Sequence, residues 1–319
     1  MFKNKCKICS GGAIVMEATE LNNEYESRPN MSKSKWTEIW EKIVEIIFFL
    51  SACMAIVSIA IITFFIFIKG VPAIAEIGLF DFIFKTDWYP EAEILGIGAM
   101  IVASIYATLG SIIIGVPIGL LTAVFIAELA PDWMIKIIKP AVELLAGIPS
   151  VVYGFFGLVI IVPIIDRTFG GGGNGLLAAI IILSFMILPT IINISVTALK
   201  AVPREYKEGS LAMGASHIQT IFKVMIPAAK SGIFAAIILG IGRAIGETMA
   251  VILVAGNSIQ IPFSILDRVR PMTAHIALEM SYAAPGLHEN SLFATGVILF
   301  IFIMILNIVL NFITSKVGE

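Results

Sequence analysis

The sequence predicts an all-α membrane protein with six transmembrane helices. Hydrophobic residues make up 58% of the chain and charged residues only 14%, whereas a soluble domain has about 25% charged residues. The mean hydropathy of +0.98 agrees with this class. A helix of about 20 apolar residues crosses a bilayer core of about 30 Å. Six apolar runs reach that length, at about 43–68, 97–127, 140–165, 176–199, 228–255 and 292–313.

The chain before the first run is polar. Residues 1–35 carry charges of both signs and little apolar sequence, so we expect a disordered cytoplasmic tail. Met31 offers an alternative translation start within it. Cys6 and Cys9 form a lone CxxC pair. Because a closed zinc site needs more ligands than one such pair supplies, we favour an incidental spacing over half of a zinc site.

The first transmembrane helix, at 43–68, leads into a long external loop at 69–96. The loop carries Glu76, Asp81, Asp87, Glu91 and Glu93, and the aromatic residues Phe80, Phe82, Phe84, Trp88 and Tyr89. A bare connector needs only a few residues, so we interpret this loop as a docking place for an external partner. A plain connection, with its aromatics in the interfacial belt, remains the alternative.

The remaining chain, at 97–315, holds the other five predicted helices. Pro117 and Pro189 lie inside two of them, where a proline removes a backbone hydrogen bond and kinks the helix. The outer connector at 257–291 is also long, and we interpret it, like the loop at 69–96, as a docking place for an external partner, with a plain connection as the alternative. Its piece at 273–280 predicts a short interfacial helix. The role of Glu143 stays open, since its side chain could face a transport pathway or the membrane interface.

Lysine and arginine are unevenly distributed between the connectors. With the N-terminus in the cytoplasm, most basic residues fall inside, and the connector after the fourth helix alone holds Lys200, Arg204, Lys207, Lys223 and Lys230. Cytoplasmic loops of membrane proteins are enriched in Lys and Arg. We therefore predict a multi-pass protein of the cell membrane with both termini in the cytoplasm.

A polar, basic segment at 203–227 precedes the fifth helix. Pro203 suits the first turn of a helix, and the residues that follow it, Glu205 among them, are mostly good helix formers. Gly214 permits a sharp turn before a second short piece. Apolar residues then recur at helical spacing, at Ile218, Ile221, Phe222 and Met225. The segment predicts two short helices along the membrane surface, and we call it the coupling segment.

Two charged residues lie inside the fifth predicted helix. Arg243 is about 22 Å along the helix from Ala228, at a rise of about 1.5 Å per residue. An Arg at mid-membrane costs about 2.5–3.5 kcal/mol, so it should face protein or water. Glu247 follows four residues later, on the same helical face. One interpretation is a structural ion pair within the helix, and the other is an anion site on a translocation path.

The anion interpretation depends on the chemistry of both groups. A guanidinium can bind a tetrahedral oxyanion through two hydrogen bonds. The Glu247 carboxylate can accept a hydrogen bond from a protonated oxyanion such as hydrogen phosphate, and sulfate at neutral pH lacks that proton. The pair therefore favours phosphate over sulfate. Gly242 and Gly246 have the small-xxx-small spacing that lets another helix approach closely.

The coupling segment resembles the coupling motif of ABC importer permeases, which reads E-A-A, three residues, G, nine residues, I-x-L-P. Here Glu208, Gly209 and Ser210 are followed at the same spacing by Gly214 and by the sequence VMIP, which ends at Pro227. Gly209 and Ser210 replace two alanines. The resemblance implies a type I importer permease fold (MetI-like), in which this segment fits a groove on an ATPase subunit.

A narrower resemblance is to the permeases of phosphate importers. It is carried by GRAIGETMAV at 242–251, ELLAGIPSVVYGFFGL at 143–158 and FDFIFKTDWYP at 80–90, with a closer likeness to PstC than to PstA subunits. The resemblance implies a PstA-like partner permease, two ATP-binding subunits and an external phosphate-binding protein. It also implies that Arg243 and Glu247 lie on the phosphate path. We expect contact with membrane lipid and none with nucleic acid.

The chain itself shows no sign of catalysis. It lacks a Walker A pattern, so we expect ATP hydrolysis on separate subunits and no cofactor on this chain. We read its three histidines, His217, His275 and His288, as solvated or interfacial, with no cluster for a metal. The alternatives are a permease for sulfate, molybdate or phosphonate, an ATP-independent anion transporter, and an intramembrane enzyme. The expected mechanism is alternating access driven through the coupling segment.

Overall fold

The computed structural model describes residues 35–318, which fall into two units divided between Ile62 and Thr63. The predicted tail, Met31 and the Cys6–Cys9 pair lie outside the described residues. Helix α2 (Lys35–Ile77) runs through both units. The described residues are overwhelmingly helical, so the predicted all-α class is confirmed.

Helix α2 is longer than the predicted span at 43–68, because it continues through Pro72 to Ile77. In the first unit its apolar side chains are exposed all around the helix, and Phe48 and Phe49 are 70% and 68% exposed. A helix that is hydrophobic on every side is either buried or surrounded by lipid. This exposed surface therefore suits a bilayer.

The second unit begins with the last turns of α2 packed against α15 (Leu287–Gly318). The rings of Phe65 and Phe293 meet edge to face, with centroids 5.5 Å apart. A Cβ atom at Gly70 would lie 2.8 Å from the backbone of Phe293. The absence of a side chain at Gly70 therefore allows the two helices to touch.

Helix α8 (Leu176–Lys200) is the central helix of this unit, and it packs along α4 (Gly98–Val124) and α12 (Lys230–Gly246). Three glycines of α4 face isoleucines of α8 so closely that an added Cβ would clash; the pairs are Gly110 with Ile180, Gly115 with Ile187, and Gly119 with Ile191. Small residues at such contacts let membrane helices approach closely. This packing fixes α8 as the scaffold for the elements around it.

The third predicted span, at 140–165, begins at the wrong residue. Pro140 lies inside an amphipathic helix, α5 (Asp132–Gly147). The chain is extended at Ile148, as expected for a residue before proline, and the span itself runs over Ser150–Phe169. That span consists of α6 (Ser150–Phe156), a π-helical turn (Gly157–Ile161) and α7 (Val162–Phe169).

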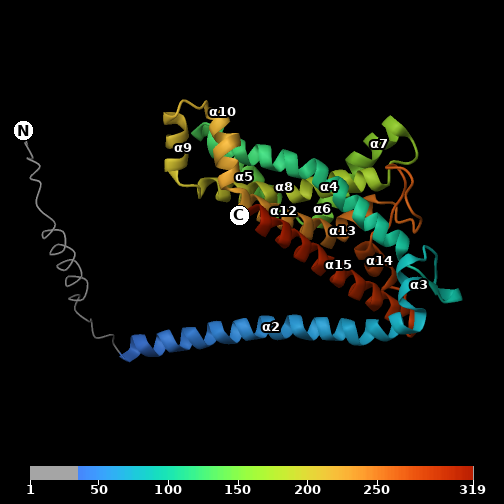
Figure 1. Cartoon of the computed structure of the whole chain (residues 1–319). Coiled ribbons are helices and arrows are strands. Elements are labelled where there is room, and N and C mark those ends of the chain that lie inside the picture. The colour runs from blue at the N-terminus through green and yellow to red at the C-terminus, as the bar shows by residue number, and fades with distance from the viewer. Residues whose placement is uncertain (1–34, 319) are drawn as a thin grey trace, which may run out of the picture. The chain divides into compact units, whose positions relative to one another are not determined.

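The predicted external loop at 69–96 has regular structure of its own. It contains α3 (Leu79–Phe84), a 3-10 turn (Pro90–Ala92) and a hairpin, whose strands β1 (Trp88–Tyr89) and β2 (Ile94–Leu95) are antiparallel. The predicted short helix at 273–280 is present as α14 (Met272–Glu279). In Figure 1, α3 and α14 lie at one end of the second unit and the coupling segment at the other. We call these the hairpin end and the coupling end.

Five helices of the described chain are long and apolar enough to cross a membrane. The number is six when α12 is joined to the segment His217–Ala228 before it, which is bent from α12 by 71°. The fifth predicted span, at 228–255, is not one helix. It divides into α12 and α13 (Met249–Val254), with a break between Gly246 and Met249.

Candidate functional site

The coupling segment forms the two predicted short helices. Helix α9 (Arg204–Ala212) follows Pro203 and ends before Gly214, whose φ of +87° is strained for other residues. Helix α10 (His217–Thr220) begins with a capping box between Ser216 and Gln219. A π-helical turn (Ile221–Met225) and the short α11 (Ile226–Ala228), which contains Pro227, complete the segment.

Polar contacts hold the coupling segment together and attach it to α4. The Ser210 and Thr220 hydroxyls are 3.0 Å apart and link its two halves. The Lys207 ammonium donates to the Glu128 carboxylate at 2.6 Å. Glu128 lies in the π-helical turn (Phe125–Leu129) that extends α4. The coupling segment is therefore attached directly to the turn that extends a membrane-spanning helix.

The outer surface of the coupling segment is available to a partner. Met213 is 90% exposed, and Glu205, Glu208 and Gly209 are exposed as well. The four apolar residues that predicted the second piece divide between its two sides. Ile221 and Met225 are buried, whereas Ile218 and Phe222 are exposed. The exposed apolar residues suit a protein surface that covers them.

The break after Gly246 changes the expected geometry of the charged pair. Glu247 has an extended backbone (φ −72°, ψ 129°), so it does not continue α12. Its carboxylate Oε1 accepts a hydrogen bond from the Ala250 backbone N–H at 3.1 Å, and its carbonyl accepts one from the Thr273 hydroxyl at 2.8 Å. The expected placement of Glu247 one turn along a continuous helix is therefore wrong.

Arg243 is only partly buried and lies in the last turn of α12. Its Nη1 donates to the Thr190 hydroxyl of α8 at 3.4 Å. Among residues 35–318, no carboxylate, Glu247 included, forms an ion pair with Arg243. A guanidinium has several N–H donors, so most of them remain free for a ligand. Thr190 was missed from the sequence, where it is one hydroxyl in an apolar run.

Gly242 and Gly246 do not pack against another helix of the described chain. Both are exposed, and a Cβ atom at either would find no atom within 4 Å. Gly240 is the glycine that faces α8, where its Cβ would meet Ile191 at 3.2 Å. The close approach of another helix that their spacing predicted is therefore not found within the described chain.

Comparison with known proteins places this arrangement in a family. Residues 115–318 match the family described as "Binding-protein-dependent transport system inner membrane component". The chain belongs to this family. The match includes the coupling segment and the break after α12, and it covers more than half of the sequence.

Individual relatives of the permease agree with the family. The chain is 38% identical over 271 residues to the "Probable ABC transporter permease protein YqgH" of Bacillus subtilis, covering 83% of this chain and 88% of that one. It is 35% identical to the "Phosphate transport system permease protein PstC" of Pasteurella multocida, covering 70% and 75%. A structure of the inward-facing MetNI methionine ABC transporter has the same fold, with a TM-score of 0.54 at 22% identity over 68% of this chain and 94% of that one.

The hairpin end of the permease contains a group of polar side chains around the buried Glu279 carboxylate, which the sequence did not predict. The Glu279 carboxylate accepts hydrogen bonds from Arg270 at 2.7 Å and from Tyr282 at 2.6 Å, and it lies 3.3 Å from His288 Nε2. We call Arg270, Glu279, Tyr282, His288 and His275 the hairpin-end cluster. Burial opposes ionisation of Glu279, but the Tyr282 hydrogen bond and neighbouring charges outweigh it and lower the pKa of Glu279.

The expectation that the histidines are solvated or interfacial is wrong for His275. This residue is fully buried on α14, and its ring meets Trp88 edge to face at 4.3 Å. Burial lowers the pKa of His275 to about 3. His275 lies one helical turn before Glu279 on α14, and that spacing was the one signal in the sequence that could have indicated the cluster.

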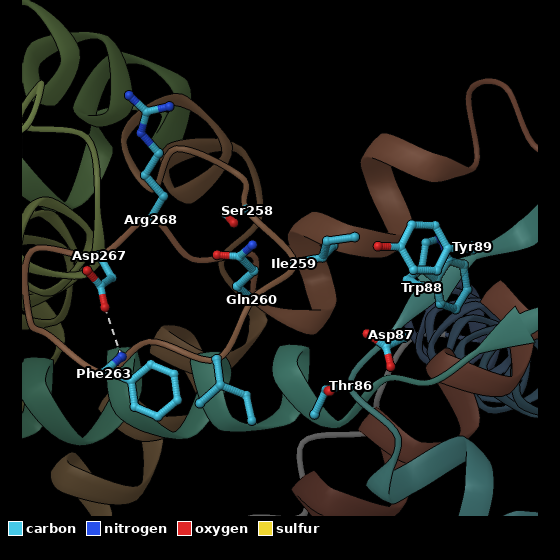
Figure 2. A pocket seen from close by; sticks show the side chains of 11 residues that line it. Thr86, Asp87, Trp88, Tyr89, Ser258, Ile259, Gln260, Phe263, Asp267 and Arg268 are labelled. Atoms are coloured by element: carbon cyan, nitrogen blue, oxygen red, sulfur yellow. Dashed lines mark hydrogen bonds between the residues drawn. The ribbon is translucent and has the colours of Figure 1, made fainter.

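A pocket of about 580 Å³ opens at the hairpin end. Figure 2 shows Thr86, Asp87 and Tyr89 on one side of it and Gln260, Asp267 and Arg268 on the other. Within the connector at 257–291, the Asp267 carboxylate accepts hydrogen bonds from the backbone N–H groups of Phe263 and Ser264. The pocket combines the two long connectors that were interpreted as a docking place for an external partner.

Proposed function

We propose that this permease imports phosphate across the cell membrane, driven by ATP. The observation that carries the proposal is Arg243, a half-buried guanidinium with no carboxylate partner in the described chain, beside a break in a membrane-spanning element. Non-helical backbone at membrane depth is tolerated where it is buried in protein or lines a water-filled path. Relatives named as PstC permeases support phosphate as the cargo.

The chemistry of the break suits hydrogen phosphate. The free donors of Arg243 can bind two oxygens of a tetrahedral anion. Glu247 lies just beyond, and only its Oε1 is engaged with Ala250 in the described chain, so its other oxygen can accept the proton of hydrogen phosphate. Sulfate at neutral pH offers no such proton and would meet repulsion from the carboxylate.

The proposal includes partners and an orientation. A PstA-like permease packs against the open face at Gly242 and Gly246, and two ATP-binding subunits receive the coupling segment, where Glu205, Glu208, Gly209 and Ser210 lie. An external phosphate-binding protein docks at the hairpin end. Both termini lie in the cytoplasm, and closure of the ATPases moves α4 through the Lys207–Glu128 contact.

The test is ATP-dependent uptake of radiolabelled phosphate into proteoliposomes that contain this chain, its partner permease, the ATPases and the binding protein. Arg243→Gln should lower the rate at least about tenfold, because a charge-assisted contact to the anion is lost. Arg243→Lys keeps the charge but not the two-point geometry, so its rate of uptake should lie between those of wild type and Arg243→Gln. Co-purification of the ATPase subunits shows that each variant assembles.

The substrate assignment has its own control. Excess sulfate should leave phosphate uptake unchanged, and labelled sulfate should not accumulate. Normal uptake by an assembled Arg243→Gln transporter would show that Arg243 is structural. Uptake of another oxyanion in place of phosphate would retain the ABC importer assignment and overturn the cargo.

A further inference from the structure

A second pocket lies at the coupling end, between α5 and α8, and has a volume of about 550 Å³. Its polar wall consists of Asn193, Thr197 and Lys200 from α8, together with Lys139 and Glu143 from α5. Apolar side chains close the rest of it, namely Ile192 and Val196 of α8, Val142 of α5 and Ile126 of the π-helical turn after α4. None of these residues contributes to the site at Arg243 as described above, and the break after Gly246 is on a different helix.

A line of polar side chains connects this coupling-end pocket to Arg243. Thr190, the partner of Arg243, is followed on α8 by Asn193, Thr197 and Lys200. At about 100° per residue these four positions fall within about 80° of the helix circumference, and they span about 15 Å along its axis. Ser195, a further polar residue of this stretch of α8, is fully buried on another face of the helix, so Thr190, Asn193, Thr197 and Lys200 form a stripe of their own.

The groups in the pocket have unused hydrogen-bonding capacity for an anion. Lys200 forms no ion pair within residues 35–318, and Lys139 is 4.0 Å from Glu143 in a pair whose side chains are more than half exposed. The Asn193 carboxamide makes no side-chain hydrogen bond to another described residue. The Thr197 hydroxyl donates to the Asn193 carbonyl at 2.9 Å. With two lysines and one carboxylate, the pocket is net positive.

We propose that the coupling-end pocket is a second anion subsite, which holds a phosphate after it leaves Arg243 and before it is released. The inference rests on the proposed function and adds to it the route of exit. Thr190 and Asn193 supply neutral hydrogen bonds between two cationic positions, so an anion moving along α8 need not shed all its polar contacts at once. The subsite binds weakly, because its charges are partly exposed to solvent.

A role in membrane orientation alone would explain Lys139 and Lys200, but it would not explain the polar stripe on α8. Lysines at helix ends reach the membrane interface with their charged groups, and they help to set orientation. Asn193 carries no charge, does not act in orientation, and is half-buried about two turns before the helix end. The phosphate of a lipid headgroup has the same chemistry as the free anion, so the experiment must separate these two occupants.

The experiment uses the complete transporter in phosphatidylcholine proteoliposomes. The double variant Lys139→Gln/Lys200→Gln and the isosteric Asn193→Asp should each lower the kcat of phosphate uptake about fivefold or more, with KM within about twofold. Lys136→Gln is the matched control, because it removes a lysine of α5 outside the pocket, and it should transport like wild type. Asn193→Asp keeps both lysines, so it remains informative if the double variant inserts poorly.

Equilibrium binding of labelled inorganic phosphate, without the binding protein, gives an independent readout. An Arg243→Gln transporter in phosphatidylcholine nanodiscs should retain weak binding, and adding Asn193→Asp should abolish it. Unchanged uptake by both pocket variants would overturn the subsite. So would a defect that appears only when phosphatidylglycerol is added, without loss of phosphate binding, because that identifies a lipid site. Absence of phosphate uptake by wild type would overturn the proposed function itself. The nanodisc assay would still show whether the coupling-end pocket binds phosphate, so the two failures can be distinguished.

Discussion

Two arginines of this permease have opposite surroundings. Arg270, at the hairpin end, donates to the Glu279 carboxylate at 2.7 Å and through Nε to the Asn257 carbonyl at 2.8 Å. Arg243, in the last turn of α12, has a single 3.4 Å contact with the Thr190 hydroxyl. Both occur in the family-matched part of the chain, and only the first has its charge neutralised by an ion pair among the described residues.

The difference separates architecture from function. A buried charge is costly unless a partner and further hydrogen bonds compensate it, and the hairpin-end cluster meets that condition around Glu279. A guanidinium left without a counter-charge in one chain needs water or a ligand in its place. The hairpin-end cluster should therefore determine stability, and Arg243 should determine transport.

The largest expected effect is on the stability of the hairpin-end cluster. Glu279→Gln keeps the shape of the side chain but leaves the Arg270 charge uncompensated, so it should lower the free energy of unfolding by about 3 kcal/mol. Arg243→Gln should change it by less than about 1 kcal/mol. Thermal unfolding of the two purified complexes, measured side by side in one detergent, checks both values.

The comparison fails if the two variants exchange phenotypes. A stable Glu279→Gln complex with impaired transport would place the hairpin-end cluster on the phosphate path. An Arg243→Gln complex that melts as early as Glu279→Gln would show that Arg243 is a structural residue. Arg270→Gln serves as the matched arginine, and it should destabilise the complex like Glu279→Gln.

The second effect is a pH dependence that arises at His275. Since its pKa is lowered to about 3 in the folded state, folding favours the neutral ring. Its contribution is complete above an unfolded pKa of about 6.5 and is lost as the pH falls toward 3, which amounts to about 2 kcal/mol at pH 5. The ionisable groups of Glu279, Arg270 and His288 surround the ring, and the pKa of Glu279 is itself lowered.

Melting temperatures at pH 7.5 and pH 5 measure this effect. The wild-type complex should lose stability between the two values, and a His275→Asn complex should lose less, although it is less stable at pH 7.5. Equal losses in the two proteins would mean that another group titrates in this range. The test sharpens the comparison because it concerns the cluster alone and leaves Arg243 unchanged.

The sequence predicted the helices better than the interruptions in them. Five apolar runs became spans, because twenty apolar residues can hardly do anything else in a bilayer. The break at Pro149 follows from the proline itself, whereas the break at Glu247 depends on tertiary contacts, such as the Thr273 hydroxyl that satisfies the carbonyl of Glu247. Apolar periodicity carries no signal for such contacts. The burial of His275 was missed for the same reason, since its contact Trp88 is far from it in sequence.

The ion pair at the coupling end tests whether burial or location decides the outcome. Lys207 and Glu128 are 2.6 Å apart, with Glu128 nearly buried and Lys207 one-third exposed. Glu128→Gln should cost about 1 kcal/mol of stability, since solvent screens the remaining lysine. It should also reduce the phosphate uptake obtained per ATP hydrolysed, because the contact attaches the coupling segment to α4. A variant that loses stability but keeps this ratio would limit the pair to a structural role.

The smallest effect comes from a position that touches no charge. Gly209 is exposed on α9, and a Cβ atom there would meet nothing within 4 Å. Gly209→Ala should therefore stabilise the helix by about 0.5–1 kcal/mol, because alanine loses less conformational freedom on folding. Thermal unfolding measures the gain, and uptake should be unchanged if the coupling segment moves as a rigid body. Slower uptake in a more stable complex would instead show that flexibility of α9 belongs to the transport cycle. Transport would then depend on the coupling segment, which an ion pair and hydrogen bonds hold in place, as well as on the unpaired Arg243.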